Sequence, residues 1–335
     1  MKMIKKIRIV FFIVCIVFSA NIRADEFAPV GTAVAQFLEI GLGARATGMG
    51  EAITAITDDA GSVFWNPAGL ADVDSRSLFS AYNTWPAGIS IGGLSAAMKL
   101  GNIGTFAVST VYLITDDMEI TTIDFPDGTG EYFNISNYSL GVTFARYLTD
   151  KVSVGLTTKL VHEGYWDYSY STWAVDMGTL YRTGFHGMNI AMSILHFGPE
   201  VNFSGDYIDY SDPKSYDAQP DPEPKAFEKY SLPINFRFGV SINLINTGTH
   251  RLISAFDMVH PNNNLEQYNL GFEYSMNRMF YLRSGYRFNT DEGGLSLGSG
   301  INLKMGESFN IRTDYSYADM GILKSIHRFS VGFDF

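Results

Sequence analysis

The sequence closes on Arg328-Phe329-Ser330-Val331-Gly332-Phe333-Asp334-Phe335. Successive side chains of an extended strand point to opposite faces, so this stretch presents one apolar face and one polar face. The apolar face carries Phe329, Val331, Phe333 and Phe335. This pattern is typical of an outer-membrane barrel strand, which has lipid outside and a polar lumen inside. The alternative is the edge strand of a soluble sandwich.

A terminal phenylalanine on such a strand also resembles the signal that the bacterial barrel-assembly machinery reads. We therefore predict that Phe329, Val331, Phe333 and Phe335 form a C-terminal assembly signal. The expected partners of the chain then include that machinery and the lipid of the outer membrane.

The first residues resemble a secretory signal. A basic start with Lys2, Lys5, Lys6 and Arg8 precedes a short apolar run over 9–18, which is too short to span a bilayer. We predict a signal peptide over 1–24, cleaved after Ala24, with Ala20 as a second candidate site. Cys15, the single cysteine, lies inside the apolar run, so a lipid anchor and disulfides are not expected in the mature chain.

Charge and pattern restrict the class of protein further. The net charge of −11 becomes more negative once the basic signal is removed, which argues against binding of nucleic acid. No later apolar run is long enough for a transmembrane helix. Together with export and alternating strands, this predicts a multi-pass protein of the cell outer membrane.

Alternating segments bounded by turn residues fill the chain after residue 75. They predict an all-β fold, a 14-stranded antiparallel transmembrane β-barrel over 76–335, with strands near 76–84, 89–100, 103–115, 132–147, 151–163, 169–182, 187–197, 232–245, 249–259, 265–276, 279–289, 294–305, 308–318 and 325–335. Turns after even-numbered strands are short, and most of those after odd-numbered strands are longer, notably 116–131 and 198–231. This asymmetry is typical of periplasmic turns and external loops.

Charged residues fall on the inward face of these strands, where they avoid the cost of about 2–4 kcal/mol for Arg or Lys facing the middle of the bilayer. We predict a lumenal ion network of Arg237, Glu273, Arg283, Arg287, Arg312, Asp314 and Arg328. Its simplest role is structural, holding the interior together or contacting a plug. Residues 25–75 do not alternate, and we expect them to fold into the lumen as that N-terminal hatch or plug.

Two stretches of the N-terminal region carry a motif. They are 41–50 (GLGARATGMG) and 58–70 (DDAGSVFWNPAGL). The first satisfies the letters of the dinucleotide fingerprint, but no strand–helix–strand unit surrounds it, so no nucleotide site is expected. Together the stretches resemble the N-terminal signature of the PorV/PorQ family of outer-membrane proteins, within the FadL-like superfamily. Asn66-Pro67-Ala68 also resembles the plug motif of FadL fatty-acid transporters.

The resemblance implies a 14-stranded barrel with a hatch and one of two functions. PorV relatives act as non-enzymatic carrier or docking components in type IX secretion, with a translocon and secreted sorting-domain proteins as partners. FadL relatives are channels for hydrophobic small molecules and pass an apolar ligand through an opening in the wall. The secretion role is our first hypothesis and the channel is the alternative.

Two sets of residues are the candidate sites for these functions. Trp65, Asn66, Pro67, Ala68 and Gly69 form the hatch motif; Asn66-Pro67 reads as a turn, so a structural role is favoured over ligand contact. Gly88, Gly92, Gly93 and Gly104 crowd the second and third strands, where glycine permits kinks. They are candidates for a wall opening, with close packing against the hatch as the alternative.

The remaining features do not indicate an enzyme. The six histidines are scattered and form no recognisable metal or nucleophile motif, so no catalytic, cofactor or metal site is predicted. The acidic, proline-rich loop 198–231 is expected to be a solvated external loop; a partner-docking or cation-binding lid is its alternative role.

Overall fold

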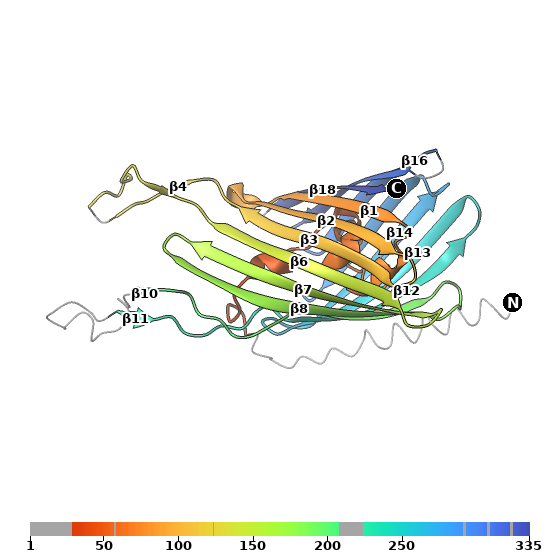
Figure 1. Ribbon diagram of the computed structural model, residues 1–335. Helices are drawn as coiled ribbons and strands as arrows, with labels where there is room; N and C mark the ends of the chain where they lie inside the picture. Colours follow the sequence, from red (N-terminus) through yellow and green to blue (C-terminus); the bar gives the residue numbers. More distant parts are fainter. Residues whose placement is uncertain are drawn as a thin grey trace.

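The computed structural model describes residues 29–335 except 57, 123, 208–223, 291–292, 307–308 and 322–323. The expected signal peptide and the middle of the loop 198–231 therefore lie outside the described residues. Fourteen strands close into one antiparallel barrel, in the order β1-β18-β17-β16-β15-β14-β13-β12-β9-β8-β7-β6-β3-β2 (Figure 1). The prediction of a closed 14-stranded barrel is confirmed.

The barrel strands are 9 to 15 residues long, enough for tilted strands to span a bilayer. Their bounds are β1 Arg76–Thr84, β2 Ser90–Leu100, β3 Gly104–Ile114, β6 Ser136–Tyr147, β7 Val152–Tyr165, β8 Tyr168–Arg182, β9 Asn189–Phe197, β12 Asn235–Asn246, β13 His250–Pro261, β14 Gln267–Met276, β15 Phe280–Phe288, β16 Leu295–Met305, β17 Phe309–Asp319 and β18 Ser325–Asp334. Each lies within a few residues of its predicted range.

Two short hairpins extend the barrel at one end. They pair β4 (Met118–Glu119) with β5 (Tyr132–Phe133), and β10 (Asp206–Tyr207) with β11 (Lys225–Ala226). In Figure 1 both lie at the end opposite to the C-terminus. The C-terminus lies at the end of the barrel that carries the short turns. The long connections lie together at the opposite end, which is the external end of an outer-membrane barrel.

The wall alternates between a buried inner face and an apolar outer face. Along β6, exposed and buried residues alternate almost without interruption. Large apolar side chains on the outer face remain exposed: Leu140 of β6 by 51%, Leu160 of β7 by 62% and Leu282 of β15 by 63%. A closed barrel satisfies all its strand hydrogen bonds, and an apolar exterior suits lipid. The fold and this outer wall are those of an outer-membrane protein.

The last strand has the two predicted faces. Phe329 is 53% exposed and Phe335 40% exposed, whereas Arg328 and Ser330 are buried on the lumenal side. β18 pairs with β1 over eight positions and so closes the barrel. Recognition of this strand by an assembly machinery stays a prediction.

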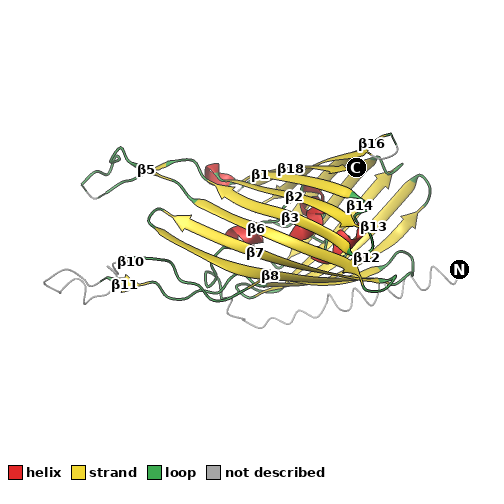
Figure 2. Cartoon of the chain, viewed as in Figure 1, coloured by secondary structure: helices red, strands yellow, loops and turns green. Residues whose placement is uncertain are grey.

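Residues 33–73, called here the lumenal segment, run inside the barrel as short helices (red in Figure 2). These are η1 Gln36–Glu39, α2 Ala44–Gly48, η2 Ala60–Phe64 and η3 Pro67–Asp72; a further turn, η4 Pro86–Gly88, joins β1 to β2. α2 packs on β15 to β18, and η3 packs on β6, β7 and β8. No helix among the described residues is long and apolar enough to cross a bilayer.

Candidate functional site

The lumenal segment reaches the wall where inward-facing glycines leave room for its backbone. A Cβ added at Gly285 would lie 2.0 Å from the carbonyl carbon of Met49, and one at Gly155 would lie 2.3 Å from that of Pro67. Such distances are far below van der Waals contact, so only glycine fits at these wall positions. The barrel sequence is therefore adapted to this segment at both α2 and η3.

The hatch motif lies at the second of these contacts. Asn66 is fully buried, and its Nδ2 donates to the carbonyl oxygens of Thr54 at 3.0 Å and Thr179 at 3.1 Å. Its Oδ1 accepts from the backbone N–H of Ala68 and caps η3, with Pro67 at the first helical position. Asn66 thus links the segment to itself and to the wall.

The other two motif residues are also buried. Trp65 is 6% exposed, and its indole N–H donates to the carbonyl oxygen of Leu42 at 2.9 Å. Gly69 lies in the buried part of η3. These contacts agree with a structural role of the motif, and a gating role stays a proposal.

The inward-facing charges are paired mainly with the lumenal segment. Arg45 of α2 donates from Nε to Glu273 at 2.9 Å and from Nη1 to Asp58 at 2.5 Å. Glu273 also accepts from Arg283 at 2.7 Å, and Arg283 donates onward to Asp314 at 2.7 Å. This chain of ion pairs, the ionic clamp, joins α2 to β14, β15 and β17.

The other members predicted for the network have partners of their own, except that Arg312 lies 3.8 Å from Asp58 and so shares this carboxylate with Arg45. Arg312 contacts Asp59 at 2.6 Å, Arg237 contacts Asp257 at 3.3 Å, and Arg287 lies 3.6 Å from Glu51. Arg328 has no carboxylate within ion-pair distance among the described residues; its guanidinium lies 5.7 Å from the ring centre of Trp85. Arg328 therefore stands outside the network, in contrast to the prediction.

Sequence reasoning missed the partners of these arginines, because Glu51, Asp58 and Asp59 lie in the segment without periodicity. Asp257 could have been found, since it faces inward on an alternating strand. Its Oδ2 accepts from the backbone N–H of Ile53 and from both N–H and Oγ1 of Thr54.

The glycine-rich wall contains no opening. The β1–β2 and β2–β3 ladders run without a register shift past Gly92 and Gly93. A Cβ at Gly92 would strike the ring of Tyr112 on the outer face, and one at Gly93 would lie 2.7 Å from Leu42 inside. Gly88 lies in η4, and Gly104 is the first residue of β3. The prediction of a wall opening is corrected to close packing, because neighbouring side chains fill the space that these glycines leave.

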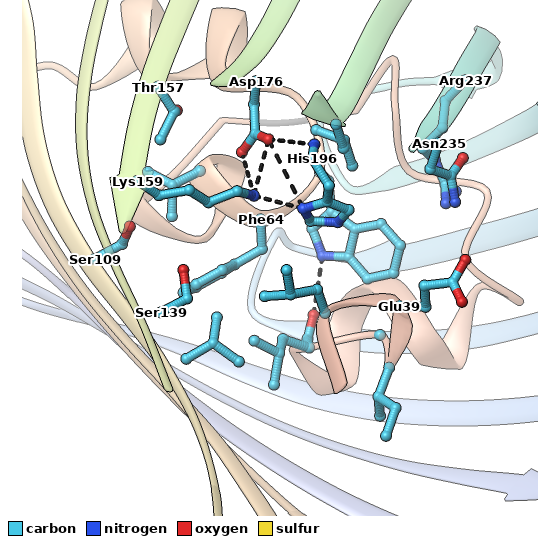
Figure 3. A pocket seen from close by; sticks show the side chains of 18 residues that line it. Glu39, Phe64, Ser109, Ser139, Thr157, Lys159, Asp176, His196, Asn235 and Arg237 are labelled. Carbon is cyan, nitrogen blue, oxygen red and sulfur yellow. Dashed lines mark hydrogen bonds and ion pairs between the residues drawn. The ribbon is translucent and has the colours of Figure 1, made fainter. Parts of the chain in front are cut away.

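A small cavity lies between the lumenal segment and the wall on the side of β3 to β9 (Figure 3). Its volume is about 50 Å³. Apolar side chains from both sides line about half of it: Leu38, Ile40, Leu42, Val63, Phe64, Trp65, Val111 and Leu195. The other half of the lining is polar: Glu39, Ser109, Ser139, Thr157, Lys159, Asp176, His196, Asn235 and Arg237. We call it the apolar cavity.

A buried polar cluster closes one side of the apolar cavity. Lys159 donates to Asp176 at 2.8 Å and lies 2.5 Å from Nδ1 of His196 (Figure 3). The backbone N–H of His196 also donates to Asp176, at 2.7 Å. The β8–β9 register shifts here, and His196 has φ +64°. Lys159 and Asp176 lie within the predicted strand ranges 151–163 and 169–182, although the sequence analysis did not single them out, and the bulge that brings His196 to them has no local signal.

A second cavity of about 360 Å³ lies toward the external end and is mainly polar. We call it the polar cavity. Its lining comprises Val30, Gly31, Ala33, Gln36, Glu39, Glu51, Asn235, Arg237, Val259, Pro261, Asn263, Asn264, Gln267 and Arg287. Burial raises the pKa of Glu39, and the charge of Glu51 raises it further, against the hydrogen bond from Asn263. Glu39, Asn235 and Arg237 line both cavities.

Metal ligands do not gather anywhere in the described part of the chain: no group of three or more His, Cys, Asp or Glu could hold an ion there. The candidate site therefore consists of two adjoining cavities around a segment fixed by ion pairs.

The fold is similar to solved outer-membrane transporter structures. A FadL homologue of Pseudomonas aeruginosa has a TM-score of 0.58 at 10% identity, covering 88% of this chain and 98% of that one. The toluene transporter TodX of Pseudomonas putida gives 0.58 at 12% identity, with 88% and 98% covered. The toluene transporter TbuX of Ralstonia pickettii gives 0.55 at 13%, with 88% and 97% covered.

No protein-family model matches the sequence, and no curated protein matches it. The PorV/PorQ resemblance therefore stays a prediction. At such low sequence identity the structural similarity establishes only the FadL-type barrel fold. The class of ligand depends on the residues of the site.

Proposed function

We propose that this protein is a non-enzymatic channel that carries hydrophobic small molecules across the outer membrane. The observation that carries the proposal is the apolar cavity between the lumenal segment and the wall. Two structures of similar fold are toluene transporters, which supports the same class of ligand. The secretion-carrier hypothesis has no comparable support, so the channel, which was the alternative hypothesis, becomes the leading function.

The size of the apolar cavity indicates how such a channel would work. A dry cavity that binds benzene has a volume of about 150 Å³. The present volume of about 50 Å³ is roughly a third of that. Passage of a monoaromatic hydrocarbon therefore requires the lumenal segment to shift, and in this proposal the segment acts as a hatch.

Toluene uptake by cells provides the test. A bacterial strain without its own hydrocarbon channel would express either the wild-type chain, Leu42→Trp or Leu94→Trp, and uptake of labelled toluene would be followed over time. Leu42 belongs to the lumenal segment, lines the cavity and is 4% exposed, whereas Leu94 belongs to β2 of the wall and is 47% exposed on the outer face.

We expect wild-type and Leu94→Trp cells to take up toluene equally fast and Leu42→Trp cells to be slowed to the rate of cells without the protein. Equal uptake in cells with and without the wild-type chain would contradict the transport function. Equally fast toluene uptake by Leu42→Trp and Leu94→Trp cells would mean that toluene does not pass through the apolar cavity.

A further inference from the structure

The wall side of the apolar cavity carries two hydroxyl groups that no neighbouring group uses. Ser109 of β3 and Ser139 of β6 both line the cavity, and neither hydroxyl has a hydrogen-bond partner among the described residues. Ser139 is only 3% exposed, yet its oxygen is not fully enclosed, because it borders the cavity. A hydroxyl withdrawn from bulk water is costly without a hydrogen bond, so these two groups point to a ligand that completes them.

The two hydroxyls lie close enough to serve one ligand atom. Ser109 pairs with Gly141 on the β3–β6 ladder, and Ser139 lies two residues before that glycine on the same inward face. The Cβ atoms of such diagonal neighbours are about 7–8 Å apart. A Cβ added at Gly141 would lie 2.8 Å from Oγ of Ser109, so this hydroxyl extends over the glycine toward β6. An oxygen atom between the two serines is then within hydrogen-bonding reach of both.

The charges around the cavity balance. Four charged side chains line it, two of each sign: Glu39, Lys159, Asp176 and Arg237. Lys159 is already paired with Asp176 at 2.8 Å, and Arg237 contacts Asp257 at 3.3 Å. Since both cations of the lining have their own carboxylates, an anionic ligand would be buried without a counter-charge. The electrostatics therefore favour an uncharged ligand.

The opposite side of the cavity comes from the lumenal segment and suits an aromatic ring. Phe64 and Trp65 line this side together with leucine and isoleucine side chains. Ser139 and Phe64 border the same space, one from the wall and the other from the segment (Figure 3). Aromatic rings favour offset or edge-to-face contacts with other rings. The cavity thus offers a ring-binding side and a hydroxyl-binding side.

We propose that the apolar cavity is a binding site for small phenols, with the ring against Phe64 and Trp65 and the hydroxyl between Ser109 and Ser139. A phenolic hydroxyl donates one hydrogen bond and also accepts, and so does each serine, so the three groups can form a continuous chain of hydrogen bonds. This inference rests on the channel function proposed above and specifies a class of substrate for it. As for toluene, entry of the ring requires the lumenal segment to shift.

Equilibrium dialysis of the purified full-length protein in lipid nanodiscs tests the proposal, with empty nanodiscs of the same lipid to subtract partitioning into the bilayer. Three probes share one ring: p-cresol carries a hydroxyl, toluene carries none, and p-toluate carries a carboxylate. Ser139→Ala, Ser109→Ala and the double variant remove the hydroxyls without taking a hydrogen bond from any described group. Ser296→Ala is the matched control, because Ser296 of β16 is also 3% exposed and lines neither cavity.

We expect p-cresol to bind the wild-type protein and p-toluate to bind at least about tenfold more weakly, because its charge has no partner. Ser139→Ala should weaken p-cresol binding about fivefold and the double variant at least about tenfold, as expected for lost hydrogen bonds. Toluene binding should change less than twofold in every serine variant, and Ser296→Ala should change neither ligand more than that. The heat-dependent shift in electrophoretic mobility that folded barrels show would confirm folding, and the single variants decide the matter should the double variant not fold.

Three results would overturn the proposal: no binding of p-cresol above that of empty nanodiscs, tighter binding of p-toluate than of p-cresol, or p-cresol binding that is unchanged in the double variant. The last result would mean that the two hydroxyls serve only water. Failure here with toluene uptake intact leaves the channel function standing. Serine-dependent binding of p-cresol without any toluene uptake would instead show a binding site and reject the hydrocarbon channel.

Discussion

The two sides of the lumenal segment are held in physically different ways. Toward β14–β17 the ionic clamp joins Arg45 to Glu273, Arg283 and Asp314. Toward β1, β2, β7 and β8 the segment packs mainly through apolar side chains, including Phe37 and Leu42, against Ile91 and Val161. Its polar contacts on this side are hydrogen bonds without an ion pair, such as those from the backbone N–H of Ala35 to Glu163 at 2.8 Å and from Nδ2 of Asn83 to the carbonyl oxygen of Gly41 at 3.0 Å. Ion pairs demand a fixed geometry, whereas apolar contacts are non-directional and can slide. The apolar side, which contains the cavity, is therefore where movement of a hatch costs least.

The largest expected effect comes from breaking the ionic clamp. Glu273→Gln leaves the guanidinium groups of Arg45 and Arg283 buried. Between them it removes one hydrogen-bond acceptor and the negative charge of the carboxylate. Loss of one member of a buried ion pair typically costs about 3–5 kcal/mol. Equilibrium unfolding by guanidinium in lipid vesicles should show a loss of this size. A loss below about 1 kcal/mol would mean that the clamp does not hold the segment.

A smaller effect is expected on the apolar side. Leu42→Ala removes a buried side chain, a change that usually costs about 2–5 kcal/mol. The existing cavity already reduces the contacts of Leu42, so we expect the lower end of that range. The enlarged cavity should also speed toluene uptake. Glu273→Gln is an independent test of uptake, because it loosens the docking of the lumenal segment on the wall. Slower uptake by Leu42→Ala would contradict a path on this side.

The difference between the two sides also explains what the sequence could predict. Each strand separates lipid from lumen, so apolar and polar side chains alternate strongly along it. This alternation predicted all fourteen strands and the inward-facing arginines. The segment itself is fixed by contacts between distant residues. Arg45 and Glu273 are 228 positions apart, and no local pattern specifies that pairing.

The glycines illustrate the same limit. Gly92 and Gly93 were interpreted from their own flexibility, but their role depends on Tyr112 across the ladder and on Leu42 inside. Likewise, Lys159 and Asp176 are visible as polar inward positions, whereas His196 joins them only through the register shift between β8 and β9. Neighbours of this kind are known only once the barrel is closed.

The hatch motif should give an intermediate effect that belongs to neither side. Asn66→Asp is nearly isosteric and keeps the cap on Ala68, but it loses both donors to Thr54 and Thr179. Leaving buried carbonyl groups unbonded costs about 1–3 kcal/mol. The same unfolding measurement would detect this. Asn102→Asp, in the exposed turn between β2 and β3, is the control and should leave the free energy of unfolding unchanged.

The smallest effect is expected for an exposed histidine–carboxylate contact, which has the same separation as an ion pair of the clamp but lies in another environment. His260 and Glu266 are 2.9 Å apart, as are Arg45 and Glu273, yet their side chains are 57% and 38% exposed instead of 12% and 3%. Exposed pairs contribute about 0–1 kcal/mol and are screened by salt. Glu266→Gln should therefore lower the free energy of unfolding by at most about 1 kcal/mol, and 1 M salt should abolish the difference. An effect as large as that of Glu273→Gln would show that pairing alone, without burial, determines how these charges hold the protein together.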